Sequence, residues 1–245
     1  FTAYAASHQN MATQINLAGK QRMLTQKMSK EILLITKSID ADANKQNLKK
    51  TAELFDKTLT GLFNGDAKLG LVKTENAIIL EKLEVVKALW KSFQKNVNAV
   101  LGGDTSSAIL EKIVQQNVPL LEKMNEAVQA YENASGSKIT PELAKTINKA
   151  GKQRMLTQKM TKELLLVANG IAVEDNKANL AKTVSAFEKA LNELIASTKD
   201  KAILAQLAKV KNLWAEYKPI LDKVDTSTEA LNKATKLNLP LLKEE

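Results

Sequence analysis

Apolar residues recur every three or four positions along nearly the whole chain, the spacing that gathers them on one face of an α-helix. Short segments of turn and N-cap residues, such as Asn64-Gly65-Asp66 and Thr140-Pro141-Glu142, interrupt this pattern. Long helices joined by short loops are typical of up-and-down bundles, so the pattern predicts an all-α protein. The predicted helices span residues 2–39, 43–63, 73–100, 105–133, 141–170, 174–197, 199–222 and 227–243.

An internal repeat divides the chain. The eleven letters AGKQRMLTQKM occur at 18–28 and again at 150–160, an offset of 132 residues. The offset falls to 124 at Trp90 and Trp214, which indicates that the loops of the second copy are shorter. The chain is therefore predicted to hold two copies of one four-helix module. We expect the two tryptophans to anchor the core from the third helix of each copy.

The predicted modules span residues 1–134 and 141–245, and the link between them is short. In an up-and-down bundle the first helix begins and the fourth ends on the same side, so the second module must turn back beside the first. This topology favours two modules side by side, related by pseudo-two-fold symmetry, with both motifs at the same height. An end-to-end stack is the alternative, and it would need a longer linker or a continuous helix.

The motif helix has two faces that are expected to be buried. Leu24, Met28 and Ile32 belong to a stripe that forms the core of their own module. Lys20 and Lys27 lie between the two faces and are expected to contact water. The second face carries small and polar residues and recurs in the second copy. Its members are Asn16, Gly19, Arg22, Met23 and Gln26, and then Asn148, Gly151, Arg154, Met155 and Gln158.

Glycine in the middle of a helix is unfavourable by about 1 kcal/mol relative to alanine. Its presence in both copies, as Gly19 and Gly151, indicates a close approach of two helices or a backbone group that is open to a ligand. Packing alone is the simpler of these two interpretations, and the sequence does not choose between them.

Composition narrows the classes of function. The net charge is +9, but lysines alternate with acidic residues along every segment, unlike the clustered charge of a nucleic-acid-binding protein. The absence of cysteine and the single histidine, His8, argue against a metal site and against a ferritin-like oxidase. Neither a nucleophile–base pair nor a glycine-rich phosphate loop is evident, so we expect no enzyme and no cofactor.

Arginine is rare, and its placement is specific. Only two of the 36 basic residues are arginine, Arg22 and Arg154, and both occupy the same position of the repeat. A guanidinium, unlike a lysine ammonium, binds an oxyanion or carboxylate through two parallel hydrogen bonds. A structural ion pair with a buried glutamate is one explanation. If the two motif helices are in contact, both guanidinium groups would instead converge on one small planar oxyanion.

The segments INLAGKQRMLTQ at 15–26 and INKAGKQRMLTQ at 147–158 resemble the hallmark of the PilJ-type sensor domain. That domain is the N-terminal ligand-binding part of type IV pili methyl-accepting chemotaxis transducers, and the motif is also similar to the periplasmic signature of nitrate/nitrite sensor kinases. The resemblance implies a four-helix bundle between two transmembrane helices, with nitrate held in some members between the first helices of a homodimer. By resemblance, the ligand would lie against Gly19, Arg22, Gly151 and Arg154, with Asn16 and Asn148 as neighbours.

The tandem copy departs from that family pattern and leaves open whether the site forms within one chain or between two, as in a homodimer. We expect a periplasmic sensor domain of a chemoreceptor or related transducer, taken from a longer protein that flanking transmembrane helices anchor in the inner membrane. Its expected ligand is a small anion, nitrate before others, bound between the motif helices. The alternative is a structural or protein-interaction module that contacts a pilus subunit or another receptor and binds no small molecule.

Overall fold

The computed structural model describes the backbone of residues 2–244 and the side chains of residues 9–136, 138–238, 240 and 241. Within these bounds the regular structure is helical, apart from one isolated β-bridge. Each helix begins and ends within four residues of its predicted bounds, so the predicted all-α class is confirmed. The elements are α1 (Thr2–Thr36), α2 (Ala41–Asn64), α3 (Ala77–Leu101), α4 (Ser107–Ala134), the 3₁₀ turn η1 (Gly136–Lys138), α5 (Pro141–Ala168), α6 (Val173–Ser197), α7 (Lys201–Asp222) and α8 (Thr228–Glu244).

Polar caps and tight turns set the helix boundaries. Before α3, α4, α5 and α7, a polar side chain accepts hydrogen bonds from backbone N–H groups of the first turn. The loops before α2 and α6 pass instead through a left-handed residue, Asp40 or Ala172. In both loops an asparagine of the following helix donates its side-chain amide to a loop carbonyl. The two modules therefore repeat the details of this turn as well as their helices.

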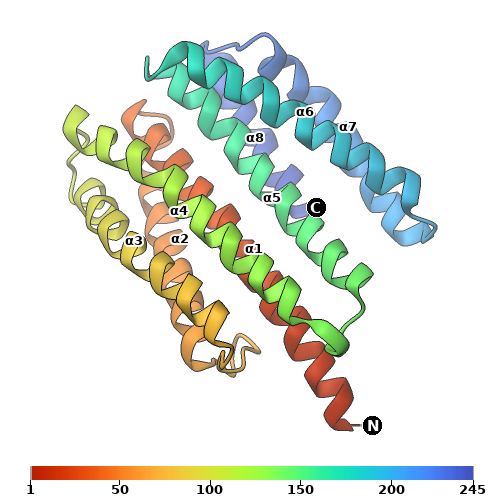
Figure 1. Cartoon of the computed structure of the whole chain (residues 1–245). Helices are drawn as coiled ribbons and strands as arrows, with labels where there is room; N and C mark the ends of the chain where they lie inside the picture. Colours follow the sequence, from red (N-terminus) through yellow and green to blue (C-terminus); the bar gives the residue numbers. More distant parts are fainter. Residues whose placement is uncertain (1, 245) are drawn as a thin grey trace.

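The two modules lie side by side, as the short link between them predicted (Figure 1). Their first helices, α1 and α5, pack against each other and form the main contact between the modules. In the first module α1 also contacts α2 and α4, and in the second α5 contacts α6 and α8. Each motif helix is therefore shared between the core of its own module and the interface with the other module.

Aromatic pairs anchor the cores of both modules in the same way. The rings of Phe55 and Trp90 lie 4.5 Å apart between centroids, and the rings of Phe187 and Trp214 lie 4.5 Å apart. Each indole Nε1 donates to a carboxylate of the second helix of its module. Both tryptophans are buried, which confirms them as core anchors. Leu24, Met28 and Ile32 of the motif helix are buried too, as their spacing predicted.

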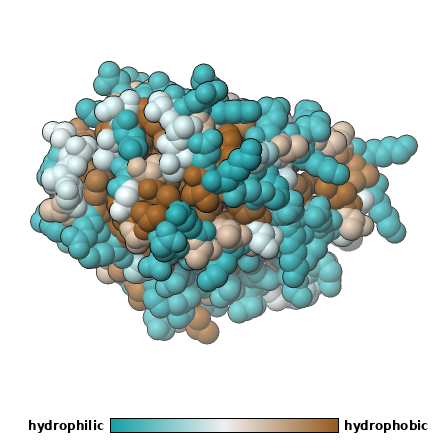
Figure 2. Space-filling model, turned by 90° about the horizontal axis from the view of Figure 1, so that it is seen from above, coloured by the Kyte–Doolittle hydropathy of each residue, from teal (hydrophilic) through white to brown (hydrophobic). Residues whose placement is uncertain are grey.

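Hydrophilic residues cover most of the surface, while apolar residues gather near the middle of the face seen from above (Figure 2). The lysines are distributed over all eight helices rather than over one face of one helix. Among the residues that the structure describes, no helix is both long enough and apolar enough to cross a bilayer.

Candidate functional site between the motif helices

Gly19 of α1 and Gly151 of α5 meet at the crossing of the two motif helices. A Cβ atom added to Gly19 would lie 3.8 Å from the Cα atom of Gly151, and one added to Gly151 would lie 3.5 Å from the Cα atom of Gly19. Both glycines are buried. The repeated glycine therefore permits a close approach of two helices, which is one of the two interpretations that the sequence left open.

Arg22 lies in this crossing and is only 1% exposed. Its Nη1 atom donates to Oδ1 of Asn125 on α4 at 2.7 Å, and its Nη2 atom donates to the carbonyl of Asn148 on α5 at 3.1 Å. A Cβ atom on Gly151 would lie 3.0 Å from Nη2 of Arg22, so the guanidinium packs directly over that glycine. The guanidinium of the first module thus reaches across the interface to the backbone of the second.

Arg154 reaches across the interface in the opposite direction, but its surroundings are more open. Its Nη2 atom donates to Oδ1 of Asn16 on α1 at 2.7 Å, and this contact is exposed to solvent. A cavity of about 390 Å³ between α1 and α5 is lined in part by Asn16 and opens beside this contact. Two copies of one motif therefore provide one buried guanidinium and one that solvent can reach.

Positive charge accumulates where the two motifs meet. Burial and the neighbouring charge of Arg154 lower the pKa of Arg22 to about 10, although Glu132 opposes this shift. Burial and Arg154 also lower the pKa of Lys20. Asn148 donates its side-chain amide to Glu132, which places this carboxylate at the edge of the same group. Two guanidinium groups and an ammonium thus share one region with the carboxylate of Glu132 at its edge, an arrangement that favours an anion.

The remaining residues of the predicted face extend along the same interface but hold other partners. Gln26 donates its side-chain amide to Asn117 on α4 at 3.0 Å, and Gln158 donates to Asn238 on α8 at 2.9 Å. The methionines that follow the two arginines, Met23 and Met155, are buried in the core. The structure therefore brings the asparagines, glycines and arginines of both motifs together, whereas the amides of both glutamines bind the fourth helix of their own module.

Two buried lysines link the modules one turn beyond the glutamines. Lys30 of α1 donates to Oδ1 of Asn238 on α8 at 2.8 Å, and Lys162 of α5 donates to Oδ1 of Asn117 on α4 at 3.0 Å. Both lysine side chains are buried. Each asparagine accepts from the glutamine of its own module and from the lysine of the other. We call this pair of crossed contacts the lysine–asparagine clamp.

The expectation that Lys20 and Lys27 face water is wrong. Lys20 is partly buried beside the arginine pair, where burial lowers its pKa. Lys27 bonds to the buried carboxylate of Glu31 and to the hydroxyl of Thr51 on α2 at 2.9 Å. The helical wheel placed both lysines between two buried faces, but the neighbouring helices also cover that strip. Lys159, Glu163 and Thr183 repeat the Lys27 arrangement in the second module.

The clamp predicts an unusual dependence of stability on pH. Burial lowers the pKa of Lys30 and of Lys162 from 10.5 to about 8, although the adjacent glutamates oppose the shift. Between pH 8 and about 9.5 the unfolded chain therefore binds more protons than the folded one, and the free energy of unfolding should rise with pH. Burial also shifts the pKa values of Tyr131 and Arg22, but both groups titrate near or above pH 10, outside this pH range.

Urea unfolding at several pH values between 8 and about 9.5 measures how steeply the free energy of unfolding rises with pH. The double variant Lys30→Met/Lys162→Met should lose most of the pH dependence, because it removes both titrating groups without shortening the side chains. An equally steep slope in the variant and the parent would contradict the assignment to these lysines.

Several residues of the site carried no signal in the sequence. Asn125 and Glu132 follow the repeated segment of α4 and belong to no repeated motif within the sequence. The clamp residues did carry a signal, since the match of the two motifs resumes at Lys30 and Lys162 after one difference, and the NVPLL and NLPLL segments begin at Asn117 and Asn238. The side chain of His8, which the sequence singled out as the only histidine, lies outside the described side chains.

Comparison with known proteins agrees with the repeat. The family model for the N-terminal part of type IV pili methyl-accepting chemotaxis transducers, PilJ, matches residues 4–116 and again 141–238. Methyl-accepting chemotaxis protein McpN of Pseudomonas aeruginosa is 39% identical over 94 residues, which cover 35% of this chain and 17% of McpN. No solved structure matched the chain. The two family matches include both motif helices and most of each module, and the chain belongs to the PilJ family of chemotaxis transducer N-terminal domains.

Proposed function

We propose that this chain is the extracytoplasmic sensor domain of a chemoreceptor and that it binds nitrate between α1 and α5. The convergence of Arg22 and Arg154 at the Gly19–Gly151 crossing carries the proposal. Each guanidinium can present two parallel N–H groups to an oxyanion, and nitrate offers three oxygens in one plane. The family match supports a role in signal transduction, and the ligand is our inference from the charges at this crossing.

An anion at the crossing would relieve an existing electrostatic cost. The neighbouring charge of Arg154 lowers the pKa of Arg22, which means that the two cations repel each other. A monovalent anion between them would replace this repulsion with two charge-assisted attractions in a largely buried setting. The contact of Arg154 with Asn16 is exposed to solvent, and Asn16 also lines an open cavity, which supports access of an anion to this half of the site.

Ligand binding would change the contacts of α4 with the interface. Arg22 donates to Asn125 on α4 and to the backbone of α5, and nitrate would compete with both acceptors for the same guanidinium. A ligand that prefers one packing of these helices shifts the population toward that packing. We infer that the displacement of α4 relative to α1 and α5 is the signal, which membrane-anchored flanking segments of a longer protein would carry across the inner membrane.

Isothermal titration calorimetry with nitrate tests the proposal, with nitrite, chloride and acetate as comparison anions. We expect saturable binding of nitrate, weaker binding of the other anions, and an affinity that falls as ionic strength rises. Nitrate should also raise the thermal midpoint, since a ligand at a hundredfold excess over Kd stabilises the folded state by about 2.7 kcal/mol. Equal responses to all four anions would argue against a built nitrate site.

One observation favours a second candidate function, a helical interaction module without a small-molecule ligand. The Arg22 guanidinium already has two close acceptors within the protein, Asn125 and the carbonyl of Asn148. In that case the arginines serve only to join the two modules. This candidate predicts no heat of binding and no thermal shift with any anion, so the same titration separates the two functions.

The substitution Gly151→Ala should weaken nitrate binding by about tenfold, the loss expected for one hydrogen bond to a charged group. Its Cβ atom would lie 3.0 Å from Nη2 of Arg22 and would force the guanidinium to move. Gly19→Ala should have a smaller effect, because its Cβ atom would lie 3.3 Å from the same atom. Calorimetry gives the affinity, and thermal unfolding checks that the folded state persists, since alanine favours a helix over glycine by about 1 kcal/mol.

A further inference from the structure

A second cavity lies between the modules, at a distance from the arginine pair. It measures about 420 Å³ and is enclosed by α1, α4, α5 and α6. Lys162, which lines it, follows Arg154 by eight residues on α5, a distance of about 12 Å along the helix axis. Cavities of this volume are typical of sites for small organic molecules. This cavity therefore needs an explanation separate from that of the anion site.

One side of the cavity is polar, buried and incompletely hydrogen-bonded. Ser29 and Glu163 are each 2% exposed, and the Ser29 hydroxyl and the Oε2 atom of Glu163 have no hydrogen-bond partner. Lys162 is 4% exposed and donates one hydrogen bond to Asn117, although an ammonium has three N–H groups. Buried polar atoms without partners are costly, and a bound molecule that supplies the missing contacts would remove that cost.

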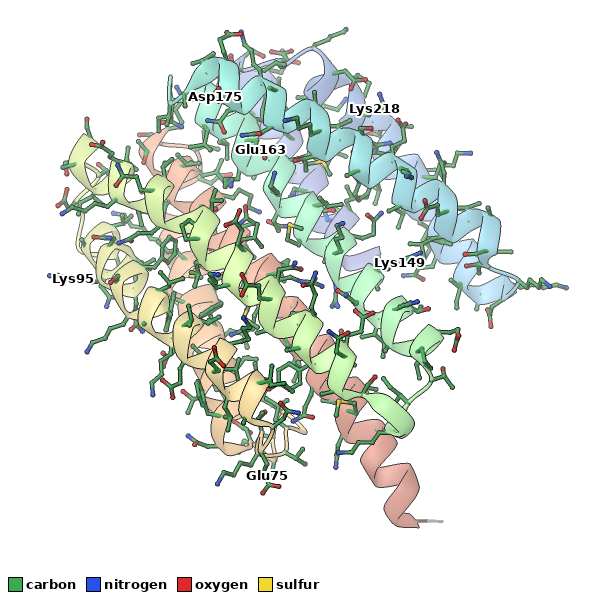
Figure 3. All side chains as sticks on the ribbon, viewed as in Figure 1. Glu75, Lys95, Lys149, Glu163, Asp175 and Lys218 are labelled. Atoms are coloured by element: carbon green, nitrogen blue, oxygen red, sulfur yellow. The ribbon has the colours of Figure 1, made fainter. Side chains whose placement is uncertain are left out.

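The cavity lining also includes a group of apolar side chains. Leu110, Ile113, Val114 and Leu121 of α4 belong to this apolar wall, and Leu33 of α1 adds to it. A ligand that fills the cavity must therefore have a hydrocarbon part as well as polar groups. Figure 3 labels Glu163 and Asp175, which lie toward the same end of the second module, and both residues line the cavity. This end lies close to the turn that joins α5 to α6.

We propose that this cavity binds a small aliphatic α-amino acid, with the carboxylate against Lys162 and Ser29, the ammonium against Glu163, and the side chain against α4. The zwitterion matches a wall that offers the Lys162 ammonium, the Ser29 hydroxyl and the Oε2 atom of Glu163, while the Oε1 atom of Glu163 is bonded to Lys159. An aliphatic carboxylate without the amino group would place its negative charge close to Glu163 and leave the Oε2 atom of Glu163 without a donor. An aliphatic amine would leave Lys162 and Ser29 without an acceptor.

A set of three probes of similar carbon skeleton tests the ligand class. L-leucine should bind saturably in isothermal titration calorimetry, whereas 4-methylpentanoate, which lacks the amino group, should bind at least tenfold more weakly. The amine 3-methylbutylamine, which lacks the carboxylate, should also bind at least tenfold more weakly. The absence of leucine binding would overturn the proposal. Equal or tighter binding of either analogue would overturn the assignment to a zwitterion.

The internal repeat supplies a matched control for the lysine. Lys162→Met should reduce leucine affinity at least tenfold, whereas Lys30→Met at the equivalent position of the first module should leave it unchanged, because Lys30 does not line this cavity. Both variants remove one buried lysine and one clamp contact, so their folding costs are comparable. Equal losses in the two variants would place leucine elsewhere and would overturn the proposal.

A variant that fills the cavity tests leucine binding without altering Lys162 and without depending on whether the protein binds nitrate. Val114 lies on the apolar wall and is only partly buried, so Val114→Trp can occupy the cavity while the helix keeps its exposed side. It should abolish leucine binding and leave nitrate binding intact, with circular dichroism to verify the helical fold. Leucine binding that survives in this variant would contradict the proposed location, whatever the outcome of the nitrate titration.

Discussion

The double variant Arg22→Ala/Arg154→Ala should bind nitrate at least a hundredfold more weakly than the parent protein. Hydrogen bonds to charged groups contribute about 1.5–3 kcal/mol each, and the variant removes the charged donor from both sides of the crossing. Removing Arg22 alone should cost more than removing Arg154 alone, because Arg22 is buried and solvent screens it less. Calorimetric titration of nitrate at fixed ionic strength measures these affinities.

The chain offers a control for the loss of two positive charges. Lys149 and Lys152 are exposed residues on the same helix as Arg154, and Lys149→Ala/Lys152→Ala lowers the net charge by the same amount. This control should change nitrate affinity no more than about twofold, as expected when only long-range attraction is lost. If the control and the arginine variant lose affinity equally, the effect arises from overall charge, and the arginine pair is not the binding site.

The second large effect is on stability, and the lysine–asparagine clamp is its cause. Asn238→Leu should lower the free energy of unfolding by about 3 kcal/mol, because it leaves the buried ammonium of Lys30 without its acceptor. The variant also removes the acceptor for Gln158 and the side-chain amide that binds the carbonyl of Thr157. Urea unfolding at neutral pH measures the loss.

A double-mutant cycle separates the clamp from the other contacts of the asparagine. Adding Lys30→Met to Asn238→Leu should recover much of the lost stability, since replacing a buried charged group with a well-packed apolar one is often neutral or stabilising. Lys162→Met, which belongs to the other half of the clamp, should recover none of it. A fully additive cycle between Lys30 and Asn238 would mean that the contact does not join the modules energetically.

The sequence predicted the parts of this protein that depend on repetition and period. Helix bounds followed from apolar spacing and caps, and the side-by-side arrangement followed from a link too short for a stack. For Gly19 and Gly151 the repeat indicated only a shared constraint, and the structure selects the close approach of two helices from the two interpretations that the sequence left open. In each case a local pattern restricts the chain to one or two structural outcomes.

The sequence could not predict what depends on the partner helix. Arg22 and Arg154 lie in identical eleven-residue segments, yet one is buried against Asn125 and the other is open to solvent beside Asn16. The difference lies in their acceptors, because Asn125 of α4 and the carbonyl of Asn148 hold the Arg22 guanidinium in the interior of the protein. Likewise, a lysine next to a glutamate resembles a solvated pair, and only the packing of α8 and α4 shows that Lys30 and Lys162 are buried.

The short turn η1 between the modules has a consequence for how such a site can evolve. In an assembly of two identical chains, every substitution appears on both sides of the interface at once. Here one chain carries both sides, so a substitution near Arg22 is not automatically repeated near Arg154. The covalent link also keeps the two halves together at any dilution. One half can therefore specialise in holding the helices together while the other is selected for access to solvent.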